Sequence, residues 1–342
     1  MQRIFITGGT GFFGKSILDY RLRHPEFLVN AELTILSRDP AAFIAANPRL
    51  SNQPGIRFIT GDVRTFSSTN FTNSTNSGAL TNSCNSCNSW TKFDTIIHAA
   101  TAAVTTLSDD EMFSTIVDGT RHILEFAKVC GAKRILFTSS GAVYGPQTAA
   151  VDESAPTNPT TAYGRGKLAA ERMCIESGIP TCIARCFAFT GPYLNRRIHY
   201  AIGNFIQDCI DNKPIVIKGD GTPLRSYLYA DDLVEWLFAI LDRGEPGRPY
   251  NVGSPEGISI RDLAETVRST LGTKNEIKVL GSASTNFTNS TNSNTPANSC
   301  NSCNSWTKPA PSTYVPIVTR AQAELNLRVT VPLSEAIRKS AR

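Results

Sequence analysis

The chain has 342 residues, of which 41% are apolar and 18% are charged. This composition can supply a buried core and excludes a wholly disordered chain, and the length predicts one large domain or two closely joined ones. The net charge of +5 is not clustered and does not predict a nucleic-acid interface. No apolar run is long enough to span a membrane and no leader precedes the first apolar stretch, so we expect no membrane partner, a cytoplasmic location and reduced cysteines.

The first half of the sequence alternates strand-like and helix-like stretches. Short runs rich in β-branched and aromatic residues predict buried strands, and they lie at residues 3–7, 32–37, 56–63, 93–99 and 134–139. Apolar residues at helical spacing follow three of these runs, at residues 15–23, from residue 39 onward and at residues 111–130. This alternation predicts the α/β class, with a doubly wound parallel sheet of the Rossmann type.

The second half is less regular. The pattern predicts helices and strands in turn, with helices at residues 162–176, 201–211, 232–241, 260–271 and 333–339 and strands at residues 181–187 and 276–280. We therefore expect the regular α/β domain to cover residues 1–185, and a smaller C-terminal α/β region to cover residues 186–342.

Residues 68–92 and 284–308 are two copies of one segment rich in Ser, Thr and Asn, with 21 of 25 positions identical. Such a segment buries too little apolar surface to offset its ordering entropy, so each copy is predicted to be a surface loop inserted into one of the two regions. Each copy carries a cysteine pair, which gives four thiols in all: Cys84, Cys87, Cys300 and Cys303. Zinc binding would require the two loops to meet, and duplication of one inserted element is the simpler explanation, so no metal site is predicted.

A glycine-rich turn joins the first predicted strand to the first predicted helix. Glycine permits a tight turn and a close approach of the backbone to a pyrophosphate, and the N-terminus of the helix offers free N–H groups to the phosphates. The order of strand, turn and helix predicts a dinucleotide-binding domain in the first region. The residues expected to contact the dinucleotide are Gly8, Thr10, Gly11, Phe12, Phe13 and Gly14.

The end of the second strand favours NADP(H) over NAD(H). An acidic residue at this position binds the ribose of NAD, whereas an arginine accommodates the 2′-phosphate of NADP. Here the strand ends in Ser37 and Arg38, which can donate hydrogen bonds to that phosphate. The alternative is that Asp39 turns inward and NAD(H) binds. Asp62, after the third strand, is placed to accept a hydrogen bond from the adenine amino group.

Tyr163 and Lys167 are four residues apart and share one face of a predicted helix. A nearby ammonium group is expected to lower the pKa of the Tyr163 phenol, which could then exchange a proton with a substrate oxygen while hydride moves to or from a nicotinamide. Ser140 follows the fifth strand and can hydrogen-bond the same oxygen. A Tyr and a Lys four residues apart are common by chance. The pair is significant here because it follows the fifth predicted strand.

Motifs along nearly the whole chain, the two repeated segments excepted, resemble the extended short-chain dehydrogenase/reductase family in its NAD(P)-dependent nucleotide-sugar epimerase/dehydratase branch. The motifs are TGGTGFFG at 7–14, GDV at 61–63, HAA at 98–100, FTSSGAVYG at 137–145, YGRGK at 163–167, ARCFAFTGPY at 184–193, GDGTPLRSYLYADDL at 219–233 and YNVGS at 250–254.

The resemblance implies roles for individual residues. Tyr163 would be the catalytic acid or base, Lys167 its partner and a ribose ligand, and Ser140 a hydrogen-bonding group for the substrate oxygen. Arg225 would bind the diphosphate of a nucleotide sugar, which makes the second region mainly substrate-binding. The resemblance also implies cofactor contacts at Val63, Ala99 and Ala100 and a substrate contact at Thr101. Homodimers are common in this family, so a homodimer is expected.

The sequence also departs from the family pattern. Members that dehydrate a hexose carry Asp-Glu directly after the catalytic Ser or Thr, and this chain has Gly141 and Ala142, neither of which can move a proton. Ile116 stands where the family usually has an Asn that supports the cofactor region, and Ala188 stands where a polar substrate contact is usual. The lack of a group that can move a proton at positions 141 and 142 disfavours 4,6-dehydration.

The sequence therefore predicts an oxidoreductase or epimerase acting on a nucleotide-diphosphate sugar, either at C4 through a transient ketone or by reduction of a 4-keto sugar. A 4,6-dehydratase-like enzyme, a reductase of non-sugar carbonyl compounds and a catalytically idle NADP-binding regulatory module stay open as alternatives, because dinucleotide folds host several functions.

Overall fold

The computed structural model describes residues 1–66, 92–101, 107–198, 200–281 and 312–342. Apart from Lys92, both repeated segments and their four cysteines lie outside these residues. Seven strands form the main sheet, in the order β11-β6-β5-β4-β1-β2-β3, and all neighbours are parallel. They are β1 (Gln2–Thr7), β2 (Ala31–Ser37), β3 (Ile56–Thr60), β4 (Thr95–His98), β5 (Arg134–Ser140), β6 (Thr181–Cys186) and β11 (Pro249–Val252). The predicted doubly wound α/β fold is confirmed.

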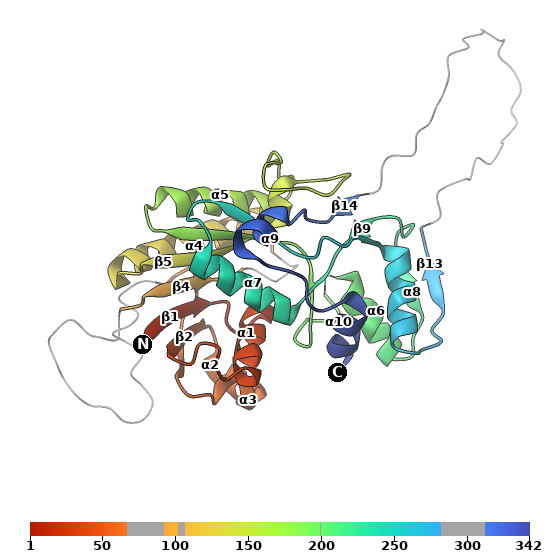
Figure 1. The fold of residues 1–342 in the computed structure, drawn as a ribbon, viewed down its shortest axis with the longest axis horizontal. Helices are drawn as coiled ribbons and strands as arrows, with labels where there is room; N and C mark the ends of the chain where they lie inside the picture. Colours follow the sequence, from red (N-terminus) through yellow and green to blue (C-terminus); the bar gives the residue numbers. More distant parts are fainter. Residues whose placement is uncertain (67–91, 102–106, 199, 282–311) are drawn as a thin grey trace, which may run out of the picture.

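Helices cover both faces of this sheet (Figure 1). Because side chains alternate along a strand, Ile4 and Ile6 pack into one core and Phe5 packs into the other. The first core is closed by α1 (Phe12–Arg23), α2 (Pro40–Ala46), α3 (Pro48–Ser51), α7 (Ala230–Arg243) and α9 (Thr319–Leu325). The second core is closed by α4 (Asp109–Cys130) and α5 (Ala162–Glu176).

The ends of α4 follow from its sequence. Ser108 and Glu111 form a capping box at the N-terminus, in which each side chain binds the other residue's backbone N–H. Gly131 ends the helix with φ 73°, a left-handed conformation that glycine adopts without steric cost. The helix therefore begins two residues before the predicted start and ends where predicted.

Strand order reverses between β1 and β4, which are neighbours in the sheet. The chain leaves these two strands for opposite faces of the sheet, so a crevice opens at their carboxyl ends. The turn after β1 and residues 99–101 after β4 lie at this switch point.

The remaining strands form three small sheets on the C-terminal side. These sheets pair β7 (Phe189–Thr190) with β10 (Leu228–Tyr229), β8 (Ile215–Ile217) with β13 (Ile277–Val279), and β9 (Leu224–Arg225) with both β12 (Ile258–Ser259) and β14 (Thr313–Tyr314). A separate core lies among α6 (Ala201–Ile210), α8 (Ile260–Thr270) and α10 (Leu333–Ala341). Because α7 and β11 return to the main sheet, the division expected at residue 185 stays a prediction.

Two differences from the predicted elements have clear causes. The third strand ends at Thr60 instead of residue 63, because β2, the strand that pairs with it among the described residues, ends at Ser37, which pairs with Thr60. The short elements β9, β14 and α9 were not predicted, since pieces of two to seven residues carry too little periodicity. Within the described ranges, no helix is long and apolar enough to cross a membrane, and five cysteines are free thiols.

Candidate active site

The glycine turn after β1 leaves no room for side chains. Gly8 has φ 73°, and a Cβ on it would lie 2.5 Å from the Ala99 carbonyl group. A Cβ on Gly14 would lie 2.1 Å from the Gly9 backbone. Gly11 is the N-cap of α1, which begins at Phe12, and has no side chain that could bond the first N–H groups of this helix. The turn therefore fits a dinucleotide pyrophosphate, which needs close backbone approach and free N–H donors.

The carboxyl ends of β1 and β4 are held together by a buried histidine. His98 Nδ1 lies 2.7 Å from Thr7 Oγ1, and His98 Nε2 lies 3.2 Å from Thr120 Oγ1. The backbone N–H of Ala100 donates to the same Thr7 oxygen at 3.1 Å. Burial lowers the pKa of His98 to about 3, so the ring is neutral. This bonding fixes Ala99 and Ala100, two expected cofactor contacts, against the glycine turn.

At the end of β2, Ser37 is buried and Arg38 is exposed. Arg38 makes no ion pair with any residue that the structure describes. Asp39 accepts a hydrogen bond from the Ala42 N–H at 2.9 Å and so caps the N-terminus of α2. The carboxylate of Asp39 is therefore engaged by α2, while the guanidinium of Arg38 stays available.

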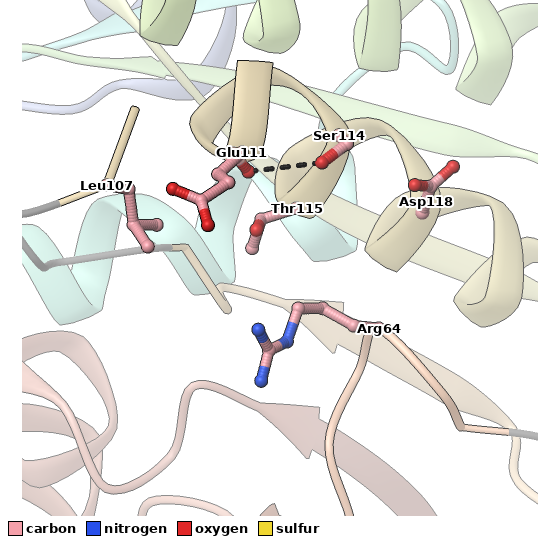
Figure 2. A pocket seen from close by; sticks show the side chains of 6 residues that line it. All are labelled: Arg64, Leu107, Glu111, Ser114, Thr115 and Asp118. Carbon is pink, nitrogen blue, oxygen red and sulfur yellow. Dashed lines mark hydrogen bonds between the residues drawn. The ribbon is translucent and has the colours of Figure 1, made fainter. Parts of the chain in front are cut away.

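Asp62 binds its neighbour Arg64, with 2.6 Å between Arg64 Nη2 and Asp62 Oδ2. Hydrogen bonds from Arg64 hold the pKa of Asp62 below its usual value. Beside this pair lies a cavity of about 130 Å³ between α4 and the residues after β3 (Figure 2). The cavity is lined by Arg64, Leu107, Glu111, Ser114, Thr115 and Asp118. Arg64 thus lines the cavity and also binds Asp62, the residue that the sequence places beside the adenine.

The structure brings Ser140, Tyr163 and Lys167 together. Ser140 ends β5 and is buried, and Tyr163 and Lys167 lie one turn apart near the start of α5. The Ser140 and Thr101 side chains lie close enough to the Tyr163 hydroxyl to oppose the rise in its pKa, and Thr101 is the residue expected to contact substrate. The Lys167 ammonium donates to the Thr138 carbonyl at 2.8 Å. Hydroxyl groups from three different segments therefore meet at the carboxyl edge of the sheet.

Burial decides the protonation of the two titratable groups. It raises the pKa of Tyr163, although the hydrogen bonds from Ser140 and Thr101 oppose this change. The expected lowering by Lys167 does not occur, because the ammonium lies 5.9 Å from the Tyr163 ring centre and points toward a carbonyl on β5. Burial also lowers the pKa of Lys167, to about 8. Without ligands, Tyr163 is therefore a neutral phenol at pH 7.

A residue that the sequence analysis missed completes this cluster. The Tyr314 hydroxyl lies 3.4 Å from Ser140 Oγ, and its ring packs at a tilt against Phe187 with 4.8 Å between ring centres. In the β9–β14 ladder Tyr314 pairs with Arg225, so the expected diphosphate ligand is its neighbour. The Arg225 guanidinium donates to the carbonyls of Leu224 and Ser312. No sequence motif marks Tyr314, and only strand pairing reveals it.

The three departures from the family pattern are structurally accommodated. A Cβ at Gly141 would lie 2.8 Å from the Phe187 ring, so this position is closed to larger residues. Ile116 is buried, and its side chain would lie 3.2 Å from a Cβ placed on Gly166. Ala188 belongs to the buried apolar cluster of the C-terminal region. Among the described residues, no group of three or more His, Cys, Asp or Glu side chains could hold a metal ion.

Comparison with known proteins agrees with these features. Residues 4–253 match the NAD dependent epimerase/dehydratase family. The chain is 29% identical over 294 residues to UDP-glucuronic acid decarboxylase 6 of Arabidopsis thaliana, which covers 82% of this chain and 77% of that protein. It is 27% identical over 275 residues to dTDP-D-glucose 4,6-dehydratase of Mus musculus, which covers 77% of this chain and 71% of that protein.

Among solved structures, the fold is similar to UDP-glucuronic acid 4-epimerase from Bacillus cereus in complex with UDP-glucuronic acid and NAD. The TM-score is 0.76 at 21% identity, and the match covers 99% of this chain and 98% of that one. The family match extends over most of the chain and includes the main sheet apart from the first two residues of β1. The chain therefore belongs to the NAD dependent epimerase/dehydratase family.

Proposed function

We propose that this protein is an NAD(P)-dependent enzyme that epimerises C4 of a nucleotide-diphosphate sugar through a transient ketone or reduces a 4-keto sugar. The observation that carries the proposal is that Ser140 and Thr101 lie close to the Tyr163 hydroxyl, with Lys167 one helical turn from Tyr163 on α5. A phenol in this position can donate a proton to a carbonyl oxygen or accept one from a hydroxyl group. The dinucleotide, when bound, supplies or accepts the hydride.

Each residue of the set has a proposed task. Tyr163 exchanges the proton of the substrate C4 oxygen, and Ser140 and Thr101 orient that oxygen by hydrogen bonds. The Lys167 ammonium stabilises negative charge that develops on the phenol and can bind the ribose of the cofactor. Arg225 binds the substrate diphosphate, which suits its planar, permanently charged guanidinium.

Position 141 favours C4 chemistry over 4,6-dehydration. The similar proteins include a decarboxylase, a dehydratase and a 4-epimerase of nucleotide sugars. Dehydratases of this family carry an acid where this chain has Gly141, and the Phe187 ring lies 2.8 Å from the place of a Cβ there. With Ala142 beside it, this part of the site has no side chain that could move a proton at C5 or C6.

The test is Tyr163→Phe, assayed by mass spectrometry of the products from UDP-glucose, UDP-galactose, UDP-glucuronic acid and a dTDP-4-keto-6-deoxy sugar with NADP(H) or NAD(H). We expect at least about a 100-fold loss of kcat, because general acid–base catalysis is removed while the ring stays. Tyr20→Phe is the matched control, since Tyr20 binds Glu235 outside the site. Equal turnover by Tyr163→Phe would overturn the mechanism, and tight NADPH binding without any turnover would favour an idle binding module.

We also propose that the cofactor is NADP(H). Exposed Arg38 has no ion pair in the described structure, and Asp39 is engaged as the cap of α2, so Arg38 can bind a 2′-phosphate, while the nearby Asp62 carboxylate is paired with Arg64. The Bacillus cereus structure holds NAD, so this preference would be a difference between the two proteins. The homodimer implied by the family stays a prediction, which analytical ultracentrifugation can measure.

Fluorescence titration with NADPH and NADH tests the cofactor preference. We expect NADPH to bind about 10-fold more tightly, and Arg38→Asp to abolish this difference, because a charge-assisted hydrogen bond contributes roughly 1.5–3 kcal/mol. Arg261→Asp makes the same change of charge on α8, in the C-terminal region, and should leave the ratio unchanged. Tighter binding of NADH by the wild-type protein would contradict the preference.

A further inference from the structure

A buried carboxylate lies directly behind the proposed catalytic residues. Glu171 is on α5, one turn beyond Lys167, and is only 4% exposed. It accepts a hydrogen bond from Ser139 Oγ at 2.5 Å. It also accepts two bonds from Arg185, at 3.0 Å from Nε and 2.8 Å from Nη2. Both oxygens of Glu171 are therefore bound by side chains from outside its own helix.

These two partners lie side by side in the main sheet. Ser139 on β5 pairs in register with Arg185 on β6. The next residue on β5 is Ser140, the proposed hydrogen-bonding group for the substrate oxygen. Because neighbours in a strand point to opposite faces, Ser139 faces α5 while Ser140 faces the site. Glu171 thus ties the helix that carries the phenol to the strand that carries the serine.

The bonding continues toward the substrate side of the molecule. Arg185 Nη1 donates to Tyr144 Oη at 3.0 Å, and Tyr144 donates to Asn251 Oδ1 at 2.7 Å. Asn251 Nδ2 donates to the Ile317 carbonyl at 3.1 Å, three residues after Tyr314. A continuous set of buried hydrogen bonds therefore links α5 to the segment whose tyrosine contacts Ser140.

Stability alone does not account for such a pair. Moving two charged groups out of water costs free energy, and the attraction between them often does not offset this cost. Apolar residues of similar volume often give equal or greater stability. What an ion pair adds is geometry, because a bidentate guanidinium–carboxylate contact fixes both distance and orientation. Glu171 lies behind the proposed catalytic residues, where a small displacement of the reacting groups has a large effect on the reaction rate.

We propose that Glu171 is a positioning residue, which fixes the separation between the Tyr163 and Ser140 hydroxyls by holding α5 against β5. The inference rests on the proposed function and gives Glu171 no contact with substrate or cofactor. Loss of the Glu171 carboxylate should lower kcat far more than it raises KM.

The charge of Glu171 provides a readout that a purely structural role would not change. The titratable groups that face Lys167 are Tyr163, Glu171 and Cys174 on α5, Cys186 on β6 and His98 on β4. Glu171 is the one carboxylate among them, and its charge favours the ammonium form. Burial lowers the pKa of Lys167 to about 8. With Glu171→Gln this pKa falls further, so functions that need the ammonium are lost at lower pH.

The experiment compares Glu171→Gln with Glu176→Gln, an exposed position on the same helix. Thermal unfolding first checks that each protein is folded. Then kcat and KM with UDP-glucose and with UDP-glucuronic acid, and NADPH affinity by fluorescence, are measured from pH 6 to 10. Ser139→Ala removes one bond to Glu171 and keeps the ion pair, and Tyr163→Phe reports on the proposed function.

We expect Glu171→Gln to lower kcat about 10- to 100-fold with KM changed less than about threefold, since small misplacements of reacting groups cost this much. The pH values at which kcat and NADPH affinity fall to half on the alkaline side, their alkaline midpoints, should be lower in Glu171→Gln. Glu176→Gln should match the wild type. A folded Glu171→Gln with wild-type kcat and midpoints overturns the inference. If it does not fold, an unchanged kcat in Ser139→Ala overturns it instead.

The two proposals fail in different ways. Full activity of Tyr163→Phe would reject the proposed function, and the NADPH midpoint would still show whether Glu171 controls the charge at Lys167. A dead Tyr163→Phe beside a fully active, folded Glu171→Gln with unchanged midpoints would reject the positioning role alone.

Discussion

At the scale of single residues, burial sets the chemistry of the site. The Tyr163 phenol and the Lys167 amine are both taken out of water, so both favour their neutral forms more than they would in solution. A neutral phenol beside Ser140 is suited to donate a proton to a carbonyl oxygen, which is what reduction of a 4-keto sugar requires. A second phenol, Tyr314, shares the serine hydroxyl and has its own pKa raised by burial.

Tyr314→Phe separates the roles of these two phenols. The variant keeps the ring that packs on Phe187 and loses the hydroxyl at 3.4 Å from Ser140. We expect kcat/KM to fall by about 2- to 12-fold, which corresponds to the loss of one neutral hydrogen bond of roughly 0.5–1.5 kcal/mol. Steady-state kinetics on the substrate that the wild type accepts is the measurement. A loss as large as that expected for Tyr163→Phe would instead identify Tyr314 as the group that exchanges the proton.

At the scale of elements, the turn after β1 and the end of β4 form one unit. The turn can approach β4 only because Gly8 has no side chain, it can pack against Ile35 on β2 only because Gly9 has none, and it can fold back on itself only because Gly14 has none. His98 and Thr7 fix the two strand ends to each other. The first N–H groups of α1 are thereby held at the switch point of the sheet, where they can bind a pyrophosphate.

Gly14→Ala tests this unit. The added Cβ would lie 2.1 Å from the Gly9 backbone, so the turn must move. We expect the free energy of unfolding to fall by about 1–3 kcal/mol and NADPH affinity to fall more than about 10-fold. Urea denaturation and fluorescence titration measure the two effects. Gly219→Ala is the control, because a Cβ there meets nothing within 4 Å and φ is not positive. Unchanged NADPH affinity in Gly14→Ala would argue against a pyrophosphate at this turn.

At the scale of the whole molecule, the site is assembled from distant parts of the chain. Ser140 and Tyr314 are 174 residues apart in sequence and are brought together by β14, which pairs with β9. The buried bonds of Glu171, Arg185 and Asn251 join the main sheet to the same C-terminal segment. The segment that contains β14 therefore reaches the carboxyl end of the main sheet, next to Ser140.

The buried His98 makes the stability of the molecule depend on pH. Its pKa falls from 6.5 to about 3 on burial, so between these values the unfolded chain binds a proton that the folded protein does not. The contribution of His98 to the free energy of unfolding is fully present above pH 6.5. It is lost as pH falls toward 3, at about 1.4 kcal/mol per pH unit.

Urea denaturation at pH 6, 5 and 4 measures this dependence. The wild type should lose stability more steeply than His98→Gln, and the difference in their unfolding free energies should change by about 1.4 kcal/mol per pH unit. Carboxylates contribute equally to both proteins, so the difference isolates His98. A difference that stays constant between pH 6 and 4 would mean that the histidine is protonated in the folded state.

The sequence by itself determined the doubly wound fold, the glycine turn and the placement of Tyr163 and Lys167 one turn apart on one helix, because strand alternation, helical spacing and glycine content act over a few neighbouring residues. Only the tertiary structure decided that Tyr314 reaches Ser140, that Phe187 closes position 141 and that Glu171 lies behind the site. It also reversed the expected direction of the Tyr163 pKa. Contacts and desolvation of this kind depend on which groups surround a side chain in space, and local sequence does not carry that information.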